Sequence, residues 1–224
     1  MAYIGKTPTA VPLTSSDIAA DIINNTHIGD TAISGFDALA TAPADTDEFL
    51  ISDAGTLKRI DASLVGGGGI TMADSWRVTS AFSGNANPLS SNWERNDTAP
   101  SLSYFGSQMT ESSGVFAFPS TGIYLIHLGV QFKLDGSSSY CSAYIQATTN
   151  NSSYINIVEC NTFVSAYITG DVYNSTFGSG LVDITDTSNQ KIRFRIDLQN
   201  TGTEMSANSV RDTLYARFIR LGDT

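Results

Sequence analysis

Apolar and polar positions alternate over a long stretch in the middle of the chain. From residue 124 to residue 134 every even position is apolar, and small or polar residues stand at most of the odd positions. The apolar residues are Tyr124, Ile126, Leu128, Val130, Phe132 and Leu134. A period of two is typical of a β-strand with one buried face. A second apolar run, Val115 to Phe118, precedes it, and the turn residues Pro119 to Gly122 separate the two. The segment Gly114 to Leu134 therefore predicts a hairpin in a β-sheet.

Shorter stretches of the same kind continue towards Thr224, separated by loops rich in Ser, Asn, Gly and Asp. The cleanest alternation places Ile192, Phe194, Ile196 and Leu198 inward and Arg193, Arg195 and Asp197 outward, which favours a strand of an outer sheet. No helix longer than two turns is indicated, so this part is expected to be all-β, a sandwich or jelly roll. The expected strands are Trp76 to Phe82, Asn92 to Asn96, Gly114 to Phe118, Gly122 to Leu134, Tyr140 to Thr148, Tyr154 to Thr162, Asp171 to Ile184, Lys191 to Leu198 and Leu214 to Leu221.

Bulky side chains are distributed unevenly. Of the aromatic residues only Tyr3, Phe36 and Phe49 precede Gly66, and four glycines follow at 66–69. A glycine run has no preferred conformation and is typical of a hinge. The sequence predicts an N-terminal attachment region (1–65), a linker (66–73) and a head (74–224). The first region is too poor in core residues to fold alone, which favours association with further copies.

An aliphatic residue recurs every five positions in the N-terminal region, at Leu13, Ile18, Ile23, Ile28 and Ile33. Neither a helix nor a flat strand collects this spacing on one face. One interpretation is a narrow trimeric stem with one aliphatic layer per repeat. The other is a short capped helix at residues 16–23, with loop afterwards. Further on, residues 48–52 and 56–60 flank Asp53-Ala-Gly55, which predicts a small hairpin. Two strands alone are marginal in water, so this hairpin also calls for a neighbour.

Charge and composition narrow the classes of partner. Twelve basic and 22 acidic residues give a net charge of −10, and no basic patch is present. Nucleic acid is therefore not an expected partner. No apolar run has the length of a membrane span or a signal peptide. Membrane insertion is therefore not expected, and the protein is expected to assemble in a cytosol.

Candidate catalytic and metal-binding residues are few. The two histidines, His27 and His127, are isolated in the sequence, and no Gly-x-Ser-x-Gly elbow supports a nucleophile. Asp183 and Asp186 lack the ligand spacing of a calcium loop and are read as solvated loop acids, with a structural calcium left open. No cofactor, catalytic residue or metal site is predicted, and the protein is not expected to be an enzyme.

The two cysteines give a test of strand register. If Asn150 and Asn151 centre a turn between two strands, Cys141 and Cys160 lie directly opposite each other. That separation is compatible with a disulfide, whose Cα atoms lie about 5.5 Å apart. Cytosolic assembly favours free thiols, and later exposure to oxygen favours a disulfide, so the redox state stays open.

The run Phe116-Ala-Phe-Pro-Ser-Thr-Gly-Ile-Tyr-Leu-Ile126 resembles the signature of the C1q and tumour-necrosis-factor-like jelly rolls, and Leu214 to Leu221 is similar to their last strand. The resemblance covers about residues 74–222 and implies a trimeric sandwich in which that strand runs through the trimer centre. It implies a trimer interface of the head at His127, Gln131, Tyr215, Arg217 and Ile219. It does not fix the ligand, because a fold does not fix a function.

A second resemblance covers about the first 65 residues. The runs Met1-Ala-Tyr-Ile-Gly-Lys6, Leu13-Thr-Ser-Ser-Asp-Ile18 and Asp47-Glu-Phe-Leu-Ile-Ser-Asp53 are similar to N-terminal parts of fibre-type proteins of marine bacteriophages. It implies a homotrimeric tail fibre or adhesin of a virion, assembled in the host cytoplasm, with residues 1–65 bound to other virion proteins. The head would contact a host surface glycan or protein.

Three further readings remain. A trimeric capsid decoration protein is the alternative with the same fold. A polysaccharide-degrading enzyme would need paired carboxylates in a groove, and a secreted C1q-like module would need a collagen stalk. Loops rich in Ser, Asn and Tyr, at Asn85–Asn87, Ser137–Ser139 and Asn150–Ser153, are the expected contact region at the far end of the head.

Overall fold

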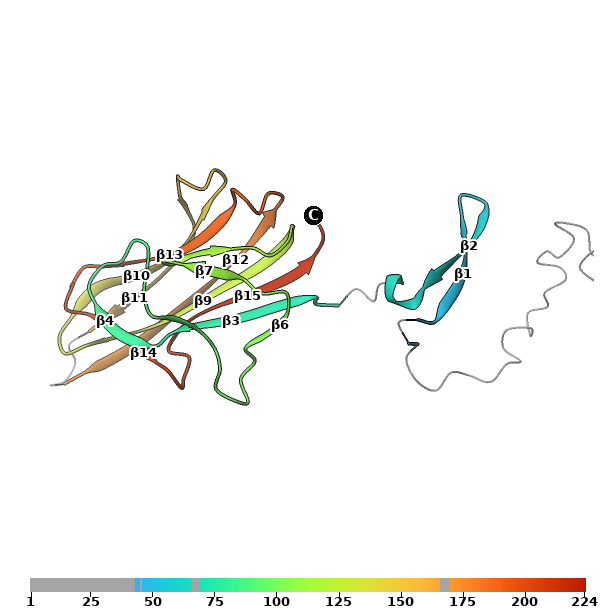
Figure 1. Cartoon of the computed structure of the whole chain (residues 1–224). Helices are drawn as coiled ribbons and strands as arrows, with labels where there is room; N and C mark the ends of the chain where they lie inside the picture. The colour runs from blue at the N-terminus through green and yellow to red at the C-terminus, as the bar shows by residue number, and fades with distance from the viewer. Residues whose placement is uncertain (1–42, 45, 66–68, 166–169) are drawn as a thin grey trace, which may run out of the picture. The chain divides into compact units, whose positions relative to one another are not determined.

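The computed structural model describes residues 43–44, 46–65, 69–165 and 170–224 (Figure 1). The chain divides between Gly67 and Gly68 into two compact units. The five positions of the predicted stem, Leu13, Ile18, Ile23, Ile28 and Ile33, lie outside the described residues, and so does His27.

The N-terminal unit contains an antiparallel hairpin of β1 (Glu48–Asp53) and β2 (Thr56–Asp61), followed by the short 3₁₀ helix η2 (Ala62–Leu64). The predicted hairpin is confirmed, with each strand one residue longer than expected. Its turn places Ala54 and Gly55 at positive φ, where glycine carries no steric cost. Leu50 keeps 74% of its surface exposed. Phe49 and Ile51 of the same strand are also exposed, as the sequence predicts for a hairpin that needs a neighbour.

The second unit, the head, is a two-layer antiparallel sandwich. The first sheet has five strands in the order β11 (Ile155–Val164), β10 (Ser138–Thr148), β13 (Lys191–Leu198), β8 (Val115–Ala117) and β7 (Thr110–Ser112). The second has eight, with the path β4 (Ser80–Ser83), β14 (Glu204–Asn208), β9 (Gly122–Leu134), β15 (Leu214–Gly222), β3 (Met72–Val78) and β5 (Trp93–Arg95). Off this path, β12 (Val172–Ile184) pairs with β9, and β6 (Tyr104–Gly106) pairs with β3.

The core between the two sheets is built around Phe116, which is fully buried. Its ring centroid lies 5.5, 5.1, 5.5 and 5.1 Å from those of four aromatic residues, namely Trp76, Trp93, Phe194 and Phe218. Edge-on and tilted pairs at these distances add to the burial of the rings themselves. The even positions predicted to face inward on β9 and β13 are all buried, which confirms both alternations.

Several strand boundaries differ from the prediction. The expected strand over residues 76–82 is two strands, because the chain leaves β3 at Thr79, whose N–H bonds to Asn92, and enters β4 beside β14. The head's first strand also begins earlier, at Met72. The short strands β6, β7 and β14 were not expected, because brief polar segments such as Thr110–Ser112 lack the alternation that marks a half-buried strand.

The prediction that Cys141 and Cys160 lie directly opposite each other is wrong by two residues. Cys160 is opposite Ala143, and Cys141 is opposite Thr162. The turn is one residue longer than assumed, and a bulge between Ile145 and Gln146 shifts the register once more. Both cysteines are buried free thiols on the core face, in diagonal rather than facing positions.

β12 lies against the side of the sandwich through two glycines. A Cβ atom at Gly178 would stand 2.9 Å from a methyl carbon of Val158 and 3.3 Å from the Cys160 sulfur, and one at Gly180 would stand 2.8 Å from Val158. These inward positions admit only glycine without movement of β11. The other face of β12 therefore carries its large side chains outward.

Candidate subunit interface

The outer face of the eight-stranded sheet is the surface of β15, β9 and β12 that points away from the core. The hydrogen-bond register sets side chains from the three strands into rows across this face. From one row to the next these are Ile219–Leu125–Leu181, Arg217–His127–Ser179 and Tyr215–Gly129–Phe177. Neighbours in such a row have Cβ atoms about 4.5–5.5 Å apart, so each row is one contact group.

Three aromatic rings form a stack in the middle of this face. The His127 ring lies 5.8 Å from that of Phe177 and 5.9 Å from that of Tyr215, with interplanar angles of 26° and 22°. Gly129 makes the stack possible, because a Cβ atom there would come within 2.4 Å of the Tyr215 ring. The Arg217 guanidinium carbon lies 4.5 Å from the centre of the Tyr215 ring. The middle of the outer face is thus an aromatic surface made by His127 of one row and by Phe177 and Tyr215 of the next.

The electrostatics of His127 follow from this packing. Partial burial lowers the pKa of the imidazole below its usual 6.5, and the positive charge of Arg217 lowers it further. β12 contributes only Ser179 and Phe177 beside the ring, and neither carries a charge. The neutral imidazole is therefore the favoured form at neutral pH.

Large apolar side chains on this face remain in contact with water. Phe177 is 72% exposed and Leu181 is 66% exposed, and Tyr173 on the same side of β12 is also exposed. Single exposed apolar residues are ordinary, but an aligned set that continues onto Leu125 and Ile219 is a patch. Such a patch is typical of a surface that another protein surface covers.

All five residues predicted for a head interface lie on this outer face. His127 and Gln131 come from β9, and Tyr215, Arg217 and Ile219 come from β15. The prediction did not include Phe177 and Leu181 of β12, although both lie in the same rows. Their signal in the sequence is the spacing of four between Tyr173, Phe177 and Leu181, with only small or polar residues between them.

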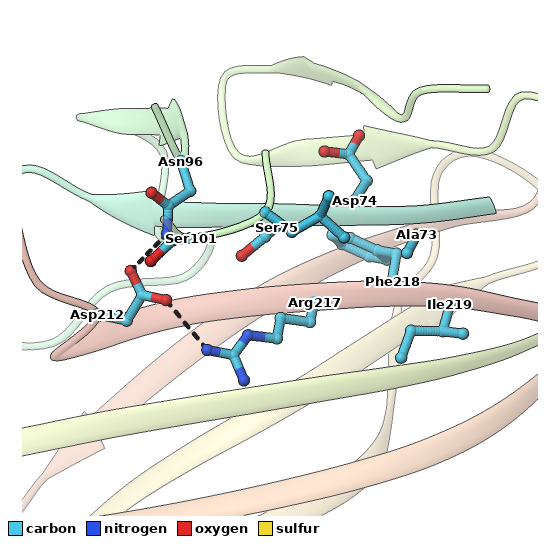
Figure 2. Close-up of a pocket in the computed structure, with 10 residues that line it drawn as sticks. Ala73, Asp74, Ser75, Asn96, Ser101, Asp212, Arg217, Phe218 and Ile219 are labelled. Atoms are coloured by element: carbon cyan, nitrogen blue, oxygen red, sulfur yellow. Dashed lines mark hydrogen bonds and ion pairs between the residues drawn. The ribbon is translucent and has the colours of Figure 1, made fainter. Parts of the chain in front are cut away.

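A small pocket of about 230 Å³ lies at the border of this face, between β15, β3 and the residues that follow β5 (Figure 2). Asp212 closes it by accepting hydrogen bonds from Asn96 (3.0 Å) and Arg217 (3.1 Å). The Asp74 carboxylate points away from this pair and accepts from Arg95 at 2.9 Å. Asp212 therefore links Asn96 to Arg217 and fixes the position of Arg217 on the outer face.

The residues considered for chemistry take structural roles. Asp186 holds its own turn by accepting hydrogen bonds from the N–H groups of Ser188 (2.8 Å) and Asn189 (3.2 Å). The pKa of Asp186 is lowered mainly by the hydrogen bond from the Asn189 side chain, and further by these N–H groups. Within the described residues, no three His, Cys, Asp or Glu side chains come together as a metal site, and no helix is long and apolar enough to cross a membrane.

The fold of the head is similar to that of solved structures, although its sequence has no match among family models or curated proteins. No protein-family model matches the sequence, and no curated protein matches it. Among solved structures, Eiger TNF from S. frugiperda matches with a TM-score of 0.50 at 15% identity, over 68% of this chain and 93% of that chain. The head is a C1q/TNF-like jelly roll. Murine APRIL at pH 5.0 also matches, with a TM-score of 0.49 at 14% identity, over 67% of this chain and 98% of that chain. The strand arrangement of the head, together with the match to Eiger TNF, confirms its predicted fold class.

Proposed function

We propose that the protein is a homotrimeric, non-enzymatic binding head that self-associates through the outer face of its eight-stranded sheet. One observation carries the proposal: Phe177 and Leu181 are 72% and 66% exposed in a single chain, in the rows of Tyr215 and Ile219 on either side of His127. A second copy of the chain is the partner that suits this surface. The sequence resembles the C1q and tumour-necrosis-factor-like jelly rolls, and that resemblance implies a trimer. The centre of this face carries one charge, that of Arg217, which is paired with Asp212 at 3.1 Å, and the residues around it are aromatic, aliphatic or small.

The place of this trimer is proposed to be a bacteriophage virion. The support is the resemblance of residues 1–65 to fibre-type proteins of marine phages, together with the exposed apolar side chains of Phe49, Leu50 and Ile51 in the hairpin. In this role residues 1–65 bind other virion proteins, and the head contacts a host surface glycan or protein as a tail fibre or adhesin. Three linked heads bind a surface far more tightly than one, because the second and third contacts form at high effective concentration.

Two measurements test the proposal separately. Native mass spectrometry or light scattering on the full chain is expected to give three times the 23.8-kDa chain mass. A monomer at micromolar concentration would overturn the trimer. Gold-labelled antibody against the head, imaged by electron microscopy on particles of the phage that encodes the protein, is expected to mark the tail. Labelling at threefold positions of the capsid would instead assign the decoration role, and no labelling would overturn a virion location.

A further inference from the structure

A groove crosses the face of the five-stranded sheet that points away from the core. It has a volume of about 540 Å³ and is lined by residues of β10, β11 and β13. Ser142 forms its floor, opposite Asp197 on one side and Asn161 on the other. Tyr140 and Tyr144 stand before and after Ser142 on the same face of β10. The hollow therefore exists because a small side chain lies between two large ones.

Hydrogen bonds hold the polar groups of this groove in place. One carboxylate oxygen of Glu159 accepts from the Tyr144 hydroxyl and from the Asn161 amide, both at 3.1 Å. One oxygen of Asp197 accepts from Arg195 at 2.6 Å, and the Arg195 guanidinium lies over the Tyr144 ring. Each carboxylate keeps its other oxygen for a ligand. Because ionised carboxylates only accept hydrogen bonds, the ligand must bring donors.

Aromatic surface accompanies these acceptors. Tyr140 is 44% exposed and Phe163 is 59% exposed, and both line the groove. A smaller hollow of about 230 Å³ shares Ser139 and Phe163 with it and continues over Ser137 to Ser138. The hollow therefore extends the groove along the same face, over residues 137–139. Exposed rings beside fixed polar groups are typical of sites for ligands with one apolar face and polar edges.

Charge selects among such ligands. Glu159 and Asp197 contribute two negative charges, and Arg195 beside Asp197 offsets one of them. No Lys, Arg or His is among the described residues that line the groove itself. An anion would therefore meet a net negative charge, and the one cation nearby, Arg195, is already paired with Asp197. A neutral ligand with several hydroxyl donors fits, because hydrogen bonds from hydroxyls to carboxylates are strong and involve no desolvation of a second charge.

We propose that this groove binds neutral saccharides, with sugar hydroxyls donating to Glu159, Asn161 and Asp197 and a ring face packed on Tyr140 or Phe163. The inference deepens the proposed function and rests on it in one respect: weak single sites become useful for attachment only when several heads are presented together. The groove lies on the sheet opposite the candidate subunit interface, so self-association and saccharide binding use different faces of the head.

The test uses the full-length protein and ligand-observed saturation-transfer NMR with glucose, galactose, N-acetylglucosamine and their disaccharides. At least one neutral sugar is expected to bind with a Kd on the order of 1 mM. Glu159→Gln and Tyr140→Ala, both at exposed positions, are expected to weaken it at least about tenfold by loss of a charged hydrogen bond and of the ring. Ile155→Ala, an exposed apolar change elsewhere on the same sheet, is the control and should leave binding unchanged.

Three outcomes would overturn the inference. The first is no binding of any neutral sugar at about 20 mM, which excludes even weak recognition. The second is stronger binding of N-acetylneuraminic acid or of a trilysine peptide, which would assign the groove to a charged ligand. The third is sugar binding that survives both groove substitutions. The chain mass and the virion location are measured separately, so failure here is distinguishable from failure of the proposed function.

Discussion

Replacing Phe177 by alanine is expected to dissociate the trimer without unfolding the head. About 140 Å² of the side chain meets water in a single chain, taking its 72% exposure and about 200 Å² for the whole side chain. At about 25 cal/mol per Å², and with alanine retaining part of the contact, the loss is about 2.5 kcal/mol per subunit. Three subunits lose about 7 kcal/mol, which lowers the association constant about 10⁵-fold. For a monomer–trimer equilibrium the dissociation midpoint then rises about 300-fold in concentration.

The assay is sedimentation equilibrium or mass photometry over a dilution series, with circular dichroism to confirm the β-fold. Ile155→Ala is the matched control, since Ile155 is similarly exposed but lies on the five-stranded sheet. It is expected to leave the midpoint unchanged. A Phe177→Ala protein that dissociates at the same concentration as the unmodified protein would refute the assignment of the interface to this face. A protein that loses its β-sheet signal would refute the view that Phe177 contributes to assembly alone.

Three further outcomes follow from the described contacts. Burial and the charge of Arg217 lower the pKa of His127 in the folded protein, so the unfolded chain binds the proton more readily. The free energy of unfolding, measured by urea titration, should therefore fall as the pH drops below 6.5 and level off below the lowered pKa. In His127→Gln the free energy of unfolding should vary less with pH over this range. The same variation in the variant and the unmodified protein would contradict the role of His127. Phe116→Ala should reduce the free energy of unfolding by about 3–5 kcal/mol, and a loss below 1 kcal/mol would show that the cluster is loosely packed. Iodoacetamide should label neither cysteine before unfolding, because both are buried and burial raises the pKa of Cys160; mass spectrometry after native labelling tests this, and rapid modification would place a thiol at the surface.

The long strands were predictable because their alternation is strong. β9 and β13 have the expected bounds, and their inward residues are buried, because one-faced burial leaves a period of two in the sequence. Strands of three to five residues were not predictable. β6, for example, is defined by its pairing with β3 rather than by any pattern of its own. The registers of the two predicted hairpins show the same contrast. The β1–β2 hairpin has a tight turn and its register was predicted correctly. The bulge in β10–β11, the hairpin of Cys141, leaves no mark in the sequence.

The interface and the groove differ in how visible they are in the sequence. The interface residues of β9 and β15 follow from a resemblance to known jelly rolls, but Phe177 required the register with β9. The groove depends on three strands being adjacent, β13 and β11 flanking β10, and this order is set by long-range pairing. The contact loops expected at one far end are in fact at two ends. Ser139 bonds to Gln199 at one end of β10, and Asn151 bonds to Asn189 at the other. Only the first of these ends adjoins the groove.

The position of β15 between β9 and β3 has a consequence for synthesis. A ribosome delivers this strand after every other strand of the head, so the sheet has an empty central slot until translation has passed Gly222. A chain that stops early lacks Tyr215, Arg217 and Ile219 together with the strand that joins the two halves of the sheet. A prematurely terminated chain would therefore lack both a continuous sheet and part of the candidate subunit interface.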